Sequence, residues 1–147
     1  MKYLMVSLYV ALLALTACNR PQNNDVGASA VAVRQTNLYM DALMAGNFDT
    51  AWKYYSPEFF KTQTDEGWRN NLTEIQKKRG KMVRYEVSDQ QMDMRYSGRF
   101  FIVIYRVWYE NSQKSSRQIV TMIEPVTGGS GLKIYAHNIH FDDVQVQ

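Results

Sequence analysis

The second half of the chain alternates apolar and polar side chains with a period of two residues, which is typical of β-strands. Four stretches show this period: residues 82–96, 99–110, 118–126 and 132–141. Three short segments rich in turn-forming residues separate them: 97–98, 111–116 and 128–131. Because successive strands joined by hairpin-length segments pair with their neighbours, the pattern predicts a four-stranded antiparallel meander.

The second of these stretches, residues 99–110, is apolar on both of its faces. One face carries aromatic and β-branched side chains: Phe101, Val103, Tyr105, Val107 and Tyr109. The other face is apolar with one charged exception: Phe100, Ile102, Ile104, Arg106 and Trp108. A strand of this kind belongs in the middle of a sheet that is covered on both sides. Since both sets are apolar, the pattern leaves open which of them meets the helices.

The first half of the chain carries apolar residues at helical spacing in three segments. Residues 28–45 form the first amphipathic segment, through these apolar positions: Val31, Leu38, Tyr39, Ala42, Leu43 and Ala45. The second segment, residues 48–55, follows a capping Asn47 and turns these side chains inward: Ala51, Trp52 and Tyr55. The third, residues 64–79, places Trp68, Leu72 and Ile75 on one face.

Helices followed by strands predict the α+β class. We expect three N-terminal helices packed on one face of a curved, four-stranded antiparallel meander. Phe59 and Phe60 fall in the connector between the second and third helices, where they are expected to plug the interface.

The N-terminal segment has the layout of a secretory signal. A short basic start precedes an apolar run at residues 4–15, which is too short to span a bilayer as a stable helix. The run ends in Leu15-Thr16-Ala17-Cys18, which resembles the lipobox of bacterial lipoproteins. That resemblance implies a lipidated Cys18. Asn19 in the next position implies anchoring in the inner leaflet of the outer membrane, facing the periplasm.

The chain is thereby divided into three parts: a signal peptide at residues 1–17, a lipidated cysteine with a flexible tether at 18–29, and a single domain at 30–147. Cys18 is the only cysteine, so an internal disulfide is excluded. Cleavage would remove Lys2 as its only charged residue and leave 16 basic and 14 acidic side chains. This balance gives no case for a nucleic-acid surface. Motifs for a cofactor or a metal are not recognised.

Motifs in the mature part resemble the bacterial members of the nuclear transport factor 2-like fold, a cone of helices and a curved sheet. They occur in this order: Ala45-Gly46-Asn47-Phe48-Asp49, Trp52, Ser56-Pro57-Glu58-Phe59, Trp68, Lys78-Arg79-Gly80 and Val83-Arg84. The last stretch, at 132–139, resembles the closing strand of domain-of-unknown-function family 4019. That family implies a secreted or lipid-anchored cone domain over residues 30–141, without an assigned reaction.

Arg106 is the charged exception in the central strand and the first candidate for a binding residue. A charge between Ile104 and Trp108 must be paired or solvated. It would recognise an anion inside the cone, form an ion pair with Glu124, or cover Trp108 on an open sheet face.

Aromatic and titratable residues supply the other candidates. Trp52, Tyr105 and Trp108 are further candidates for binding a ligand or a partner. Trp52 would line a pocket with other aromatic residues of the first half, although aromatics at helical spacing also build cores: Tyr55, Phe59, Phe60 and Trp68. His140 and Asp142 share a face of the last strand and would meet, or else lie exposed at its end. His137 points the other way, which disfavours a two-histidine metal site.

These features predict a lipid-anchored, non-catalytic periplasmic module that binds an envelope protein or a small apolar ligand. A homodimer is a further candidate assembly. One alternative is a small isomerase- or cyclase-like enzyme with an acid or base in the cone cavity. Another is an immunity or envelope-assembly lipoprotein. A closed pocket with a buried ionisable group would favour the enzyme, and an exposed apolar sheet face would favour a protein partner.

Overall fold

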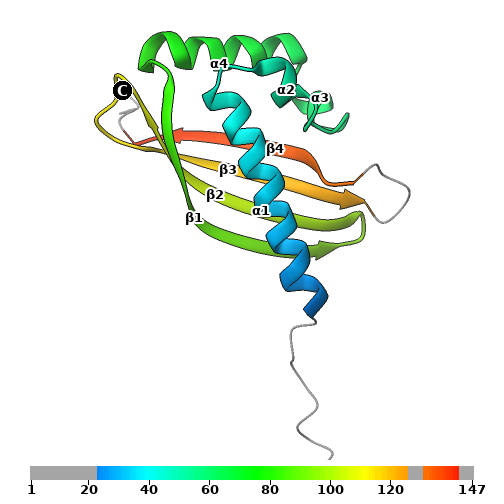
Figure 1. The fold of residues 1–147 in the computed structure, drawn as a ribbon. Coiled ribbons are helices and arrows are strands. Elements are labelled where there is room, and N and C mark those ends of the chain that lie inside the picture. Colours follow the sequence, from blue (N-terminus) through cyan, green and yellow to red (C-terminus); the bar gives the residue numbers. More distant parts are fainter. Residues whose placement is uncertain (1–22, 126–130, 143–147) are drawn as a thin grey trace, which may run out of the picture.

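The computed structural model describes residues 23–125 and 131–142, which form four helices and four strands in these ranges. In chain order the elements are α1 (Asn23–Met44), α2 (Phe48–Trp52), α3 (Phe59–Thr62), α4 (Asp65–Arg79), β1 (Met82–Arg95), β2 (Gly98–Tyr109), β3 (Ser116–Pro125) and β4 (Lys133–Phe141). The expected signal peptide and the lipidation of Cys18 lie outside the described residues. The expected α+β class, with helices before strands, is confirmed (Figure 1).

The four strands form one antiparallel sheet in the order β1-β2-β3-β4, which is the expected meander. The register pairs Arg95 with Gly98 at the first hairpin and Ser116 with Val107 across the next one. Irregularities in β1 and between β3 and β4 interrupt the pairing locally. Such bulges bend and twist strands.

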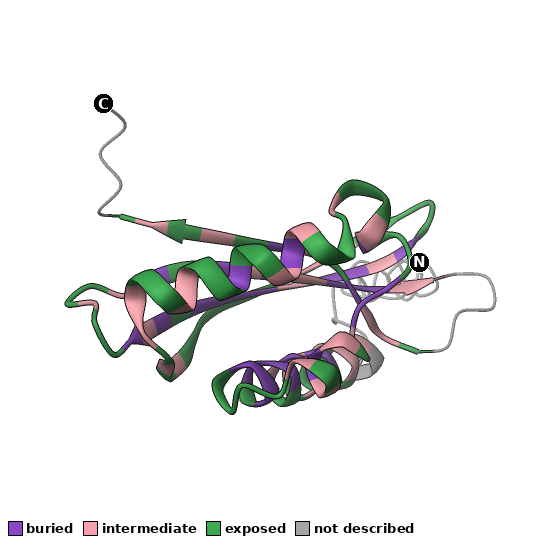
Figure 2. Cartoon of the chain, turned by 90° about the horizontal axis from the view of Figure 1, so that it is seen from above, coloured by how far each residue is buried: buried purple, intermediate pink, exposed green. Residues whose placement is uncertain are grey.

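The helices lie on one side of the sheet, with α1 crossing its face and α4 lying along the edge formed by β4 (Figure 1). The side of β2 that meets the helices is fully packed through the following residues: Phe101, Val103, Tyr105, Val107 and Tyr109. This decides the strand phase that the pattern left open. Buried residues run along the middle of the sheet, and the outer sides of the helices are exposed (Figure 2).

Helix α1 begins earlier and is rotated relative to the sequence-based expectation. Residues 23–27, expected in the tether, belong to the helix instead. Val31 and Leu38 were expected on the apolar face, yet they are 39% and 46% exposed. Thr36 and Met40 are fully buried in their place. The Thr36 hydroxyl is satisfied inside, because it donates to the Ala32 carbonyl at 2.7 Å.

Local capping sets the boundaries of the shorter helices. The Asn47 side chain accepts from the backbone N–H of Thr50, so the predicted cap of α2 is present. The connector expected between the second and third helices contains one further turn, α3, which begins at Phe59. Helix α4 starts at a Thr64 cap and ends at Gly80, whose φ of 78° reverses the chain into β1. None of the helices in the described ranges has both the length and the apolar character needed to cross a bilayer.

Candidate functional site

A continuous hydrogen-bonded chain of side chains crosses the interior between the helices and the sheet. The Trp68 indole N–H donates to the Tyr55 hydroxyl at 2.6 Å, and the Tyr55 and Tyr39 hydroxyls are bonded to each other. The Tyr39 hydroxyl lies 2.8 Å from Nδ1 of His137. These residues come from α4, the segment after α2, α1 and β4, so the chain of bonds ties four parts of the fold together.

The second half of this chain runs through β3 to the end of β2. Nε2 of His137 lies 2.9 Å from the side-chain oxygen of Gln118. The Gln118 amide nitrogen lies 2.8 Å from the Tyr109 hydroxyl and 3.4 Å from the Ser116 hydroxyl. Gln118 and Ser116 are buried, so these bonds replace water that the groups would otherwise need.

Donor and acceptor chemistry gives the chain of bonds one direction. An indole N–H only donates and an amide oxygen only accepts, so Nε2 of His137 carries the proton and donates to Gln118. Its Nδ1 therefore accepts from Tyr39, which accepts from Tyr55 in turn. At the far end the Tyr109 oxygen accepts from Gln118. The hydroxyl hydrogen of Tyr109 thus remains available for donation.

Burial sets the protonation states along this chain. Burial lowers the pKa of His137 from 6.5 to about 3, which keeps the imidazole neutral near neutral pH. Burial also raises the pKa of Tyr39, Tyr55 and Tyr109 above the ordinary value, so these phenols stay protonated. A neutral imidazole and protonated phenols are the states that the assigned direction of the hydrogen bonds requires.

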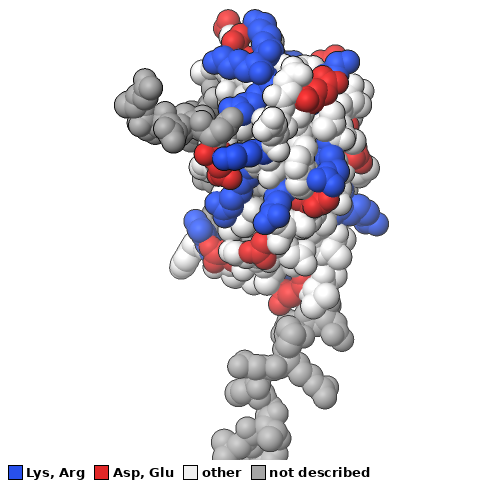
Figure 3. Space-filling model, turned by 90° about the vertical axis from the view of Figure 1, so that its left-hand side faces the viewer, with Lys and Arg blue, Asp and Glu red and all other residues white. Residues whose placement is uncertain are grey.

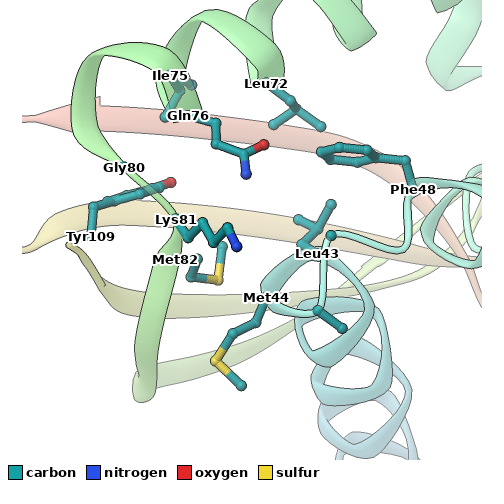
Figure 4. A pocket seen from close by; sticks show the side chains of 12 residues that line it. Leu43, Met44, Phe48, Leu72, Ile75, Gln76, Gly80, Lys81, Met82 and Tyr109 are labelled. Atoms are coloured by element: carbon teal, nitrogen blue, oxygen red, sulfur yellow. The ribbon is translucent and has the colours of Figure 1, made fainter. Parts of the chain in front are cut away.

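Tyr109 also lines a cleft of about 230 Å³ at the end of α1 that is nearer to α4 (Figure 4). Its walls are mainly apolar: Leu43, Met44, Phe48, Leu72, Ile75 and Met82. The α1–α2 turn and Gly80 complete the lining. The volume lies just below the range of about 300–1,000 Å³ that is usual for ligand pockets, so the cleft suits a small ligand.

Three polar side chains border this apolar cleft: Gln76, Lys81 and Tyr109. The Gln76 amide, the Lys81 ammonium and the Tyr109 hydroxyl all point toward its middle (Figure 4). Within the described ranges Lys81 forms no ion pair through its side chain. The cleft therefore presents hydrogen-bond donors, one of them charged, next to apolar walls.

Trp52 and Tyr105 both lie on the helix side of the sheet, where each makes its own set of contacts. Trp52 packs against Tyr55 and Phe60, and the Arg69 guanidinium lies 4.0 Å above its ring. Its indole N–H is buried without a hydrogen-bond partner in the described part of the chain. The Tyr105 hydroxyl donates to Asn37 on α1 at 2.8 Å. Neither residue lines the cleft.

Arg106, Trp108 and His140 lie on the outer side of the sheet. Arg106 is exposed and pairs in register with Glu86 and Arg117. Its suggested partner Glu124 instead bonds Arg99, at 2.7 Å. Trp108 is covered by Arg84, at 3.8 Å from the ring, and not by Arg106.

His140 is exposed near the end of β4, as is Asp142. Clusters of three or more metal-ligating side chains are absent from residues 23–125 and 131–142. On the face shown in Figure 3, basic and acidic side chains are interspersed with uncharged surface. Such mixing produces no large single-sign field there.

The cleft and the internal chain of bonds were not identified from the sequence. Gln118 is the clearest signal that was available, because it is a polar residue in phase with the apolar positions Val120 and Met122 of β3. A polar side chain at an inward position needs a buried partner. Lys81 carried no such signal, because a lysine after a helix is ordinarily solvated.

The chain was compared with known families, curated proteins and solved structures. No family model and no curated protein matches it. Among solved structures it is similar to Bd1075 of Bdellovibrio bacteriovorus, with a TM-score of 0.56 and 10% sequence identity. The likeness covers 79% of this chain and 41% of Bd1075, so the chain spans less than half the length of that protein. At this identity the likeness establishes a shared fold alone.

Proposed function

We propose that this protein is a lipid-anchored binding module of the bacterial cell envelope, which holds a small amphipathic carboxylate in its cleft. The lipobox-like segment ending at Cys18 supports the anchor, and Asn19 supports the outer membrane, facing the periplasm. The order of helices and strands is consistent with the nuclear transport factor 2-like cone and with domain-of-unknown-function family 4019.

The chemistry of the cleft carries the proposal for the ligand. Apolar walls favour a hydrocarbon group, while the Lys81 ammonium and the Tyr109 O–H require an acceptor. The direction of the internal bonds makes Tyr109 a donor at this place. A carboxylate on a short apolar chain satisfies all of these groups at once, and its negative charge complements Lys81.

A non-catalytic role fits the distribution of acids and bases. His137 is neutral and bonded on both ring nitrogens, inside the network and outside the cleft. Carboxylate and imidazole side chains do not line the cleft in the described part of the chain. An isomerase- or cyclase-like reaction would need such a group against the substrate.

Occupation of the cleft is tested by an NMR titration with hexanoate on the chain that begins at Asn19. Met44 lines the cleft and is 37% exposed, so Met44→Trp would fill the cleft at small risk to folding. Leu38→Trp is the matched control, because Leu38 lies on the same helix, is 46% exposed and does not line the cleft.

Hexanoate is expected to shift the amide signals of Leu72, Gln76 and Tyr109 in the unsubstituted protein and in Leu38→Trp, but not in Met44→Trp. Equal shifts in both variants, or shifts confined to residues away from the cleft, would refute this site. Thermal melting of both variants checks that each remains folded.

A further inference from the structure

The start of α1 limits how far the domain can lie from its proposed anchor. Helix α1 begins at Asn23, so only five residues of chain lead from Cys18 to the helix. Five extended residues span at most about 18 Å. The tether expected from the sequence, reaching residue 29, would span roughly 40 Å. One end of the domain is therefore held close to any membrane that carries the lipid.

That end consists of the first turns of α1 and the β1–β2 hairpin. The Arg99 guanidinium at the base of the hairpin lies 3.6 Å from the Asp25 carboxylate of α1. Helix α1 starts at the end of the molecule opposite α4 (Figure 1). Since α1 has 22 residues, its two ends lie about 33 Å apart.

The large apolar side chains at this end are unusually exposed. Tyr96 in the hairpin turn is fully exposed, Met94 on β1 is 65% exposed, and Val26 on α1 is 63% exposed. These are the three highest values among the exposed large apolar side chains in the described ranges. Met94 faces Arg99 in the strand register, and Arg99 contacts the residue before Val26. The three residues therefore lie at the same end of the domain, and we call the exposed apolar surface that they form there the hairpin patch.

We propose that the hairpin patch, formed by Val26, Met94 and Tyr96, rests on the surface of the lipid bilayer that holds the anchor. The inference rests on the proposed lipidation of Cys18. Tyrosine is enriched at membrane–water interfaces, where its ring meets the acyl boundary and its hydroxyl meets the headgroups. The start of α1 is held within about 18 Å of the lipid, so an apolar patch at the same end of the domain has the bilayer as its nearest apolar partner.

The charged residues near the hairpin patch are paired with one another, which favours an apolar contact between the patch and the bilayer. Arg99 is paired with Asp25 and Glu124, and Arg95 lies 2.6 Å from Asp93. Because both arginines are neutralised by carboxylates, attraction to anionic lipids is not the driving term. Contact with the bilayer is expected to be the same on neutral and on anionic vesicles.

This orientation has a consequence for the cleft. Its lining residues Leu43 and Met44 lie at the far end of α1, about 25–27 Å along the helix from Val26 of the hairpin patch. The cleft would then open away from the membrane, where a periplasmic ligand can reach it.

The contact is tested with the full chain, expressed in a bacterium that processes lipoproteins and reconstituted into phosphatidylcholine vesicles. An environment-sensitive fluorophore is attached at Tyr96→Cys, and a matched label at Gln113→Cys, an exposed position in the turn between β2 and β3. Lipids carrying a nitroxide near the headgroup then act as quenchers. The unsubstituted chain is treated with the same fluorophore as the control for a free Cys18 thiol.

Quenching by roughly half at position 96, with little at 113, is the expected result for a residue at the interface. Quenching that is equal at the two positions, or that needs anionic lipid, overturns the hairpin contact. If the unsubstituted chain takes up the fluorophore and does not float with vesicles, lipidation itself fails. The two proposals can therefore fail separately.

Discussion

Replacement of His137 by leucine tests the internal chain of hydrogen bonds most severely. His137 is 6% exposed and bonded through both ring nitrogens, to Tyr39 and to Gln118. Leucine can fill much of the space of the ring but makes no hydrogen bond. The substitution therefore leaves the Tyr39 hydroxyl hydrogen and the Gln118 amide oxygen buried without partners.

The expected cost follows from these two orphaned groups. Each buried polar group without a partner costs about 1–3 kcal/mol, and the added apolar burial of leucine returns roughly 1 kcal/mol. We expect His137→Leu to lower the free energy of unfolding by roughly 2–4 kcal/mol. Single domains have about 5–15 kcal/mol in total, so the melting temperature should fall by roughly 10 °C.

Urea unfolding at pH 7, followed by tryptophan fluorescence, measures this loss. His140→Leu on the same strand is the control, because His140 is exposed and its substitution should stay within about 0.5 kcal/mol. A loss below about 1 kcal/mol in His137→Leu would refute the network, since the orphaned groups would then have found water or other partners.

Four further predictions concern pH, two backbone positions and the cleft. The folded pKa of His137, about 3, lies below the unfolded value of 6.5, so its contribution to stability is complete above pH 6.5 and is lost as the pH falls toward 3. Urea unfolding at pH 7 and pH 5 should differ by about 2 kcal/mol from this residue, and His137→Leu should lack that component. Gly80→Ala should lower the free energy of unfolding by roughly 1–3 kcal/mol in the same assay. The φ angle of Gly80 is 78°, and an added Cβ would lie 2.8 Å from the Cβ of Glu110, the residue after β2. Gly27→Ala in α1 meets nothing within 4 Å and should stabilise by roughly 0.5–1 kcal/mol; destabilisation there would contradict the helical start of α1. Lys81→Gln should weaken hexanoate binding by about 2- to 5-fold in calorimetry, whereas Lys78→Gln, an exposed lysine outside the cleft, should leave it unchanged.

The order and type of the main elements were predictable because they follow from local patterns. The alternation in the second half places all four strands nearly where the structure has them. The cap at Asn47 and the helix end at Gly80 were also predicted correctly, since capping depends on neighbouring residues. These are features that a few adjacent side chains decide.

The rotation of α1 and the interior network depended on contacts between distant residues. Thr36 is polar and would be expected at the surface, but it is buried, and its hydroxyl is hydrogen-bonded to the Ala32 carbonyl and the Met122 sulfur. His137 lies 98 residues from its partner Tyr39, so only the tertiary register brings the two together. Hydropathy ranks such residues as polar, and no local pattern shows that their hydrogen bonds are made inside.

Arg106 illustrates a different difficulty. A charged residue in an apolar strand indicated a cavity, an ion pair or an open sheet face, and one side of this sheet is not covered by any described helix. Arg106 is solvated there, and the cross-strand charge pair involves Arg99 and Glu124 instead. The alternating pattern predicted the strand correctly. Whether helices cover one or both of its faces depends on how the whole chain packs, which the local pattern does not show.

The most direct test of the central claim compares two ligands of equal chain length and opposite charge. Calorimetric titrations with hexanoate and with hexylammonium, under identical salt, ask whether the cleft recognises an acceptor through Lys81 and Tyr109. We expect saturable binding of hexanoate, lost in Met44→Trp, and no binding of hexylammonium. Equal binding of both ligands, or binding of hexylammonium alone, would contradict the account, because the Lys81 ammonium repels a second ammonium group.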